Sequence, residues 1–307
     1  MSARGLGVAL AVGLIGMPWL VAEAARPIDT QAEQIRAQAT SSGNVRQSRV
    51  ADASTGNIPF SFGDAAPISP LISPKIAGQI AKLERTVHVN PRNASAWNKL
   101  GHLKQRTGDL QGAKRAYQAV LKLGLYHGNR EVQAAAYANL GIVYKISGDL
   151  DRAQVAHQKA LKLNTRIGRR DRMADAYINL GVIHQAKGEY EAAIDAQLKA
   201  LAINRQLGNR PGMANAYGNL GVVYKLTGDL LKAETSLTSS LTLKEHLGDR
   251  EGVAKAHANL GSIYLSRGNV AEACRLWSRA HGAFTAVNHR QWAKVVKTWM
   301  LESSCRS

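Results

Sequence analysis

Cysteine is almost absent from this chain, since its 307 residues include only Cys274 and Cys305. Two cysteines are too few to build a fold from disulfide bonds, and they lack the paired spacing of a metal site. In an oxidising compartment they would form one disulfide if a terminal helix folds back and brings the tail near the helix that carries Cys274. The alternative is a buried Cys274 and a frayed Cys305, and the residues leave both open.

Catalytic and metal-binding motifs are lacking too. The sequence contains no G-x-S-x-G elbow, no Walker loop and no H-E-x-x-H pair. Its nine histidines are scattered, and His157, His184 and His257 occupy repeat positions that suit core or groove lining. We therefore expect no catalytic residue, no metal and no cofactor, and we predict that the protein is not an enzyme.

A long apolar run occurs only at the N-terminus. Arg4 precedes apolar residues 5–20, and residues 22–24 form an A-x-A cleavage motif. The run is shorter than the ~20 residues of a membrane-spanning helix and contains glycine and proline. We predict a signal peptide at 1–24 whose removal leaves a periplasmic or secreted chain with no permanent membrane span. An uncleaved inner-membrane anchor is the alternative.

Acidic residues are few, with 22 Asp and Glu against 40 Lys and Arg, so the formal net charge is +18. Arginines cluster near one turn at Arg166, Arg169, Arg170 and Arg172. Such a charge suits nucleic acid, but the predicted export and the lack of interleaved stacking aromatics argue against it. Anionic envelope surfaces, acidic proteins or polysaccharides fit better, and the charge also serves solubility.

The next part of the chain changes from aperiodic to periodic. Residues 25–72 are rich in Ala, Ser, Gln, Gly and Pro without a sustained period, which predicts a flexible leader. Apolar residues then recur at three- and four-residue steps and predict a leading helix over 73–90. Asn90 and Pro91 are expected to end this helix and to start the next one.

A forty-residue repeat follows. The dipeptide Leu-Gly recurs at Leu100-Gly101, Leu140-Gly141, Leu180-Gly181, Leu220-Gly221 and Leu260-Gly261. Seven residues after each of these glycines comes another, at Gly108, Gly148, Gly188, Gly228 and Gly268. Five registers without a slip predict five stacked structural units.

Each unit reads as a helical hairpin. In the second unit, Gly148 can take the left-handed conformation that ends one helix, and Asp149 can cap the next. Gly141 and Ala153 are small enough to let the two helices approach closely. We expect five hairpins over residues 91–288, followed by a C-terminal capping helix and tail over 289–307.

The spacing resembles the tetratricopeptide repeat family. The residues Trp97, Leu100, Gly101, Gly108, Ala113 and Tyr117 match its signature, which returns at Tyr137, Leu140, Gly141, Tyr144, Ala153 and Ala160. The usual unit has about 34 residues, whereas the forty-residue unit is similar to the kinesin light chain and Pins-type subtype, here in an exported bacterial member. The resemblance implies an all-α, right-handed superhelical solenoid of helix-turn-helix repeats.

The resemblance also implies that the first helices of the hairpins line a concave groove that holds an extended or helical peptide. By this resemblance alone, the groove positions are those of an asparagine ladder, Asn139, Asn179, Asn219 and Asn259. A side-chain amide offers both a donor and an acceptor, which suits it to hold a peptide backbone. The alternative is that each asparagine ties adjacent hairpins together.

Helical spacing from the ladder gives the remaining groove positions. They are Asp175, Asn215 and Lys255 one turn before it, Lys145, Gln185 and Lys225 beyond it, and Ile142, Val182 and Val222 between. The predicted groove has an apolar floor with a mostly basic and amide rim. It favours a ligand that carries acidic side chains or a terminal carboxylate.

Together these features predict a non-enzymatic scaffold or adaptor for protein–protein interaction in an envelope or secretion-associated complex. The expected partner is a protein with an acidic or extended peptide segment, and nucleic acid is not expected. One alternative is a basic protein that binds anionic polymers or surfaces. Another is an accessory regulator of an envelope enzyme.

Overall fold

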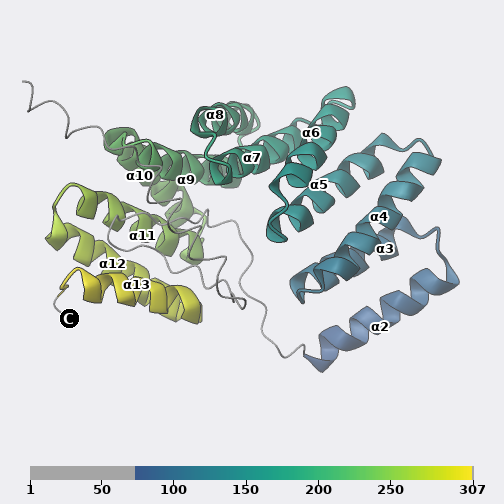
Figure 1. Cartoon of the computed structure of the whole chain (residues 1–307), viewed down its shortest axis with the longest axis horizontal. Coiled ribbons are helices and arrows are strands. Elements are labelled where there is room, and N and C mark those ends of the chain that lie inside the picture. The colour runs from purple at the N-terminus through teal and green to yellow at the C-terminus, as the bar shows by residue number, and fades with distance from the viewer. Residues whose placement is uncertain (1–72, 306–307) are drawn as a thin grey trace, which may run out of the picture. The chain divides into compact units, whose positions relative to one another are not determined.

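Twelve α-helices make up nearly all of residues 73–305, the part of the chain that the computed structural model describes, and no strand occurs in that range (Figure 1). They are α2 (Pro74–Val89), α3 (Ala94–Arg106), α4 (Leu110–Tyr126), α5 (Arg130–Ile146), α6 (Leu150–Arg166), α7 (Arg170–Ala186), α8 (Tyr190–Gln206), α9 (Arg210–Leu226), α10 (Leu230–His246), α11 (Arg250–Ser266), α12 (Val270–Ala286) and α13 (Arg290–Glu302). The predicted signal peptide at 1–24 and flexible leader at 25–72 lie outside the described residues.

The leading helix α2 packs its apolar face on the first hairpin. Val87 is buried with Leu100 of α3 and Ala116 of α4, and Ile80 and Leu83 pack against the same cluster. The apolar residues whose spacing of three and four residues predicted this helix are therefore the residues on its buried face.

Pro91 does not begin α3, so that expectation was wrong. Helix α2 ends at Val89, and α3 begins at Ala94 after Asn93. The Asn93 side chain accepts a hydrogen bond from the Ala96 amide at 2.9 Å. An asparagine cap satisfies one of the unpaired amides of a first turn, which a proline cannot do.

A glycine stands in the turn inside each hairpin, and in every hairpin but the third, where Glu189 makes no cap bond, a side chain caps the second helix. Gly148 has a φ of +80° and ends α5, and the Asp149 carboxylate accepts from the Arg152 amide at 3.1 Å at the start of α6. Both features confirm the prediction for these residues. At the turn before α13, Asn288 takes the left-handed conformation in place of glycine, with a φ of 58°.

Close packing inside each hairpin depends on the glycine of the Leu-Gly pair. A Cβ added to Gly141 would lie 2.5 Å from Nε2 of His157 on α6. The same relation holds between Gly101 and Tyr117, Gly181 and Gln197, Gly221 and Leu237, and Gly261 and Trp277. Each first helix therefore approaches its partner closely enough for one second-helix side chain to lie against a bare backbone.

The hairpins stack in chain order. Each helix contacts the next one along the chain, and the first helices α5, α7, α9 and α11 also contact one another in series. A lone hairpin would leave one apolar face in water, and its neighbour covers that face. The fold class is an all-α solenoid of helix-turn-helix repeats, as predicted.

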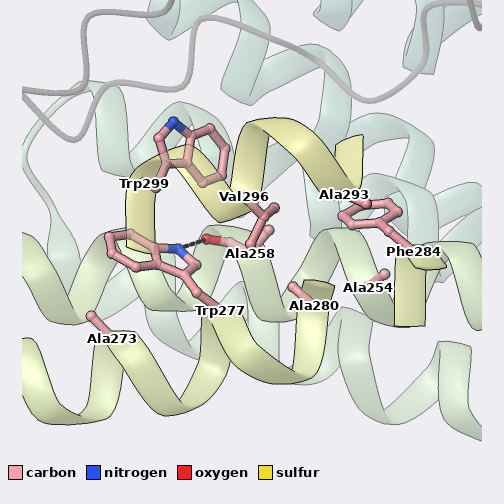
Figure 2. Close-up of a cluster of buried hydrophobic side chains, with 9 residues drawn as sticks. All are labelled: Ala254, Ala258, Ala273, Trp277, Ala280, Phe284, Ala293, Val296 and Trp299. Atoms are coloured by element: carbon pink, nitrogen blue, oxygen red, sulfur yellow. Dashed lines mark hydrogen bonds between the residues drawn. The ribbon is translucent and has the colours of Figure 1, made fainter. Parts of the chain in front are cut away.

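Aromatic side chains close the C-terminal end of the stack. Trp277 and Phe284 of α12 pack against Val296 and Trp299 of α13 (Figure 2). The indole N–H of Trp277 donates to the Ala258 carbonyl at 3.1 Å. Helix α13 thus covers the last hairpin.

A disulfide joins Cys274 on α12 to Cys305 just after α13, with a Cα–Cα distance of 5.4 Å. The two residues are 31 positions apart in the sequence. A bond that closes a loop of this length stabilises a fold by about 4 kcal/mol, largely because it restricts the unfolded chain. It ties the tail and the capping helix to the last hairpin.

Candidate functional site

The asparagine ladder lies at one register on four successive first helices, α5, α7, α9 and α11. Asn139 Nδ2 donates to Asn98 Oδ1 of the preceding hairpin at 3.0 Å, so this amide links adjacent hairpins. Asn179 Nδ2 donates to the Asp175 carbonyl of its own helix at 2.9 Å. Asn259 is only 5% exposed, whereas the other three are partly exposed. The ladder is thus accessible along three of its four members.

Most of the predicted groove residues meet in one recess of about 350 Å³ along α9, α10 and α11, which we call the C-terminal recess. Eight of its lining residues were predicted: Lys145, Asn179, Val182, Asn215, Asn219, Val222, Lys255 and Asn259. They come from four helices, α5, α7, α9 and α11. Its volume lies within the ~300–1,000 Å³ range typical of ligand sites.

A second recess of about 470 Å³ lies along α5, α6 and α7 and reaches Asn98 and His102 of α3; we call it the N-terminal recess. It is lined by Asn98, His102, Glu131, Ala134, Ala135, Ala138, Asn139, Ile142, His157, Asn164, Arg169, Arg172, Asp175, Ala176, Ile178 and Asn179. Many of its positions correspond to those of the C-terminal recess after a shift of eighty residues, such as His157 and Leu237. Asn179 lines both recesses, so they adjoin along the layer of first helices.

Two predicted groove residues line neither recess. Gln185 is only 8% exposed. Lys225 lies in surroundings that strip water from its ammonium group, and this desolvation lowers its pKa to about 8. Both follow the ladder by six residues, as does Lys145, which lines the C-terminal recess, so this register does not by itself decide whether a side chain reaches a recess.

Several lining residues were missed because they belong to second helices or to turns. In the C-terminal recess these include Lys244 of α10 and Asp249 of the following turn, and in the N-terminal recess Asn164 of α6. His157 of α6, for which the sequence predicted a place in the core or lining the groove, lines the N-terminal recess as well. Their signal in the sequence is variation at a fixed repeat position: residues 124, 164, 204, 244 and 284 are Gly, Asn, Asn, Lys and Phe.

The two recesses differ in charge. The C-terminal recess contains three lysines, Lys145, Lys244 and Lys255, and two carboxylates, Asp249 and Glu251, so its formal charge is 3 − 2 = +1. Burial is the largest influence on Lys244 and lowers its pKa, although Asp249 lies 3.6 Å away. A recess with a net positive charge and a partly desolvated ammonium group on Lys244 favours an anionic ligand.

In the N-terminal recess the charges balance. Glu131 and Asp175 face Arg169 and Arg172, and these four side chains pair with one another or with Asp171. Asp175, whose carboxylate is 3.5 Å from Arg172, stands where the C-terminal recess has Lys255. Partial desolvation raises the pKa of Asp175. This recess does not share the preference for an anion.

Neither a metal site nor a membrane span is found among residues 73–305. No cluster of three or more His, Cys, Asp or Glu side chains in this part of the chain is placed to hold a metal ion. None of its helices combines the length and apolar character that crossing a bilayer requires.

Stacked hairpins with a groove along their first helices define a helical-repeat protein of the solenoid class. The family model described as "Tetratricopeptide repeat" matches residues 92–166 and 172–246, and a second model with the same description matches residues 254–279. The chain therefore belongs to the tetratricopeptide repeat family.

Known proteins of the family resemble it over different lengths. A TPR repeat-containing protein of Pseudomonas aeruginosa is 33% identical over 51 residues, which are 17% of this chain and 49% of that protein. The match therefore spans about half the length of that relative.

Solved structures match over more of the chain. BtubC (BKLC) from P. vanneervenii has a TM-score of 0.59 at 23% identity and covers 70% of this chain and 90% of its own. For the kinesin light chain TPR-like repeats from Podosopora anserina the TM-score is 0.52 at 16% identity, and the match covers 64% of this chain and 98% of that chain. For the apo form of RapI the TM-score is 0.57 at 14% identity, and the match covers 75% of this chain and 92% of that chain. At these identities the likeness establishes the fold alone.

Proposed function

We propose that the protein is a non-enzymatic scaffold that binds an extended, acidic segment of a partner protein along its first-helix groove. Repeat families of this kind supply protein-binding surfaces. The observation that carries the proposal is the C-terminal recess, where side-chain amides from successive hairpins lie beside three lysines. Amides can pair with a peptide backbone, and lysines with carboxylates.

Two of the four turn arginines, Arg169 and Arg172, are already paired with carboxylates, which gives the anionic-polymer alternative less support. Arg169 bonds to Glu131 and Asp171, and Arg172 lies within 3.6 Å of Asp171. Arginines already paired with carboxylates gain less from a polyanion, because the new contact must replace an existing one.

Replacing Asn179 and Asn219 together with alanine is expected to abolish peptide binding and to leave the helical content unchanged. The ligand source would be a random peptide library selected on the purified chain, with binding of the selected peptides measured by fluorescence anisotropy. Both asparagines line the C-terminal recess and are partly exposed, so their loss removes ligand contacts without opening the core.

The matched control is Asn139→Ala, which removes an amide already bonded to Asn98 and outside the C-terminal recess. It should lower affinity less than the double replacement does. Selected peptides that lack acidic residues, or that bind the double variant with wild-type affinity, would move the site elsewhere.

We also propose that the chain is exported to the bacterial envelope or beyond, where it takes part in an envelope or secretion-associated complex. The N-terminal sequence pattern supports this, and so does the Cys274–Cys305 disulfide, since such bonds persist mainly in oxidising compartments. Protein purified from its native envelope with thiols blocked at lysis should contain no free thiol. Finding two titratable thiols, or the protein in the reduced cytosol, would contradict export.

A further inference from the structure

The groove position one helical turn before the asparagine ladder carries a different charge in successive hairpins. It is Ala135 on α5, Asp175 on α7, Asn215 on α9 and Lys255 on α11. The first two line the N-terminal recess and the last two line the C-terminal recess. The first three are exposed and Lys255 is half-buried. Along one register the groove wall therefore changes from a carboxylate to an ammonium group over two hairpins.

The Asp175 carboxylate is accessible from the N-terminal recess. Its side chain is 53% exposed and lines that recess. The backbone carbonyl of Asp175 accepts the hydrogen bond from Asn179 Nδ2, so this bond does not occupy the carboxylate. Among residues 73–305 the carboxylate has one cationic contact, with Arg172 Nη1 at 3.5 Å. A ligand in the recess can therefore reach a carboxylate that is only loosely paired.

Arg172 is shared with a second carboxylate, which weakens its hold on Asp175. Its Nε lies 3.6 Å from Asp171, and Arg169 pairs with both Asp171 and Glu131. Three carboxylates thus share two guanidinium groups, which gives this group of ion pairs a formal charge of 2 − 3 = −1. The C-terminal recess has the opposite sign.

The surroundings of Asp175 also remove part of its hydration. Desolvation is the largest cause that raises the pKa of this carboxyl group, and the charge of Asp171 acts in the same direction, against the influence of Arg172. A carboxylate that has lost water without gaining a close cation is stabilised when a ligand supplies an ammonium or guanidinium group.

The spacing of the first helices sets how far apart the two charges lie. The first helices α7, α9 and α11 contact one another in series. Packed helices have axes about 8–10 Å apart, so α7 and α11 are separated by roughly 20 Å. An extended chain advances ~3.3 Å per residue, and an even number of residues returns side chains to the same face. An extended segment therefore needs about six residues to reach from one position to the other.

We infer that the partner segment is bipolar, with a lysine or arginine that pairs with Asp175 and acidic residues about six positions away in the C-terminal recess. This rests on the proposed function and deepens it, because it assigns a second charge to the same ligand. A segment that is acidic throughout would place a carboxylate against Asp175, which costs affinity. Asp175 is then a residue that determines specificity, and the two charges fix the direction in which the segment lies along the hairpins.

The test selects a random library of twelve-residue peptides in parallel on the purified full chain and on two variants of Asp175. Peptides from the wild type should be enriched in lysine or arginine about six positions from an acidic residue. Asp175→Asn removes the charge and copies the residue of the next hairpin, so the enrichment should disappear. Asp175→Lys should instead select an acidic residue there, a gain that misfolding cannot produce.

A mutant cycle measures the contact itself. The basic residue of one wild-type peptide is replaced with glutamine, and both forms are titrated by fluorescence anisotropy. The replacement should weaken binding to the wild type about fivefold, the upper end for an accessible ion pair. It should have no effect on binding to Asp175→Asn.

The matched control is Asp195→Asn, which makes the same change on α8 at a residue that lines neither recess. It should keep both the enrichment and the fivefold difference. Wild-type peptides without the basic residue, or an enrichment that survives Asp175→Asn, would overturn the inference.

These outcomes are separable from those of the proposed function. If the selected peptides are acidic and depend on Asn179 and Asn219 but show no coupling to Asp175, the groove binds peptides and the bipolar assignment is wrong. If a basic residue couples to Asp175 in peptides that ignore the two asparagines, the contact at Asp175 exists and the proposed scaffold site is wrong.

Discussion

Replacing Gly261 with alanine is expected to lower the free energy of unfolding by about 3 kcal/mol. The new Cβ would lie 2.6 Å from Cδ1 and Nε1 of Trp277, which is 2% exposed, and 3.2 Å from the Ala273 carbonyl oxygen. The indole cannot yield without losing its bond to Ala258 and disturbing the cluster under α13 (Figure 2). Overpacking costs about 1–3 kcal/mol and a lost buried hydrogen bond about as much, while better helix propensity returns ~1 kcal/mol.

Gly282→Ala is the matched control, because it makes the same change in the adjoining helix α12 at an exposed site with no atom within 4 Å. It should raise stability by about 0.5–1 kcal/mol through helix propensity alone. Urea unfolding followed by helical circular dichroism measures both variants. Similar effects of the two variants would mean that Gly261 is not in the close contact described.

Acidification is expected to remove about 3 kcal/mol of stability through His157. Burial is the main cause that lowers its folded-state pKa from 6.5 to about 4. Above pH 6.5 the imidazole is neutral in both states and contributes no pH dependence. Between pH 6.5 and 4 the unfolded chain binds a proton that the folded chain does not, so stability falls with falling pH. Each unit of pKa difference corresponds to about 1.4 kcal/mol.

The measurement is the difference between the wild type and His157→Leu across this pH range, because other groups titrate equally in both chains. The leucine variant should be the more stable at pH 7, since it removes two ring nitrogens that have no hydrogen-bond partner among residues 73–305, and its advantage should grow by about 3 kcal/mol at pH 4. The stability of Gln197→Leu should change with pH in the same way as that of the wild type. Parallel curves for His157→Leu would show that His157 is not held neutral by burial.

The local structure of the hairpins could be predicted residue by residue. Gly148 ends one helix and Asp149 caps the next, and both act through contacts within a few residues. The structure has both in the expected roles. Pro91 was misassigned because proline and Asn93 compete for the same helix start, and the asparagine cap two residues on decided it. Local rules therefore located the hairpin turns but not this helix start.

The site was predictable only where it repeats with the hairpin. Asn179 and Asn219 were found because they share a register, and they line the C-terminal recess. Lys244 and Asn164 were not assigned to the groove, because each reaches it from a second helix through a gap that exists only between stacked hairpins. Gln185 holds the same register on α7 as Lys145 on α5, yet only Lys145 lines a recess.

Sequence alone determined the repeat length, the helical hairpin and the stacking order, because these follow from short-range caps, glycine conformations and an apolar period that each hairpin carries in itself. Tertiary structure alone decided which side chains share a recess, which amides bond to one another and which lysines lose water. Those properties depend on distances between residues of different hairpins, and packing sets such distances. The placement of His157, buried and without a partner, belongs to this second group.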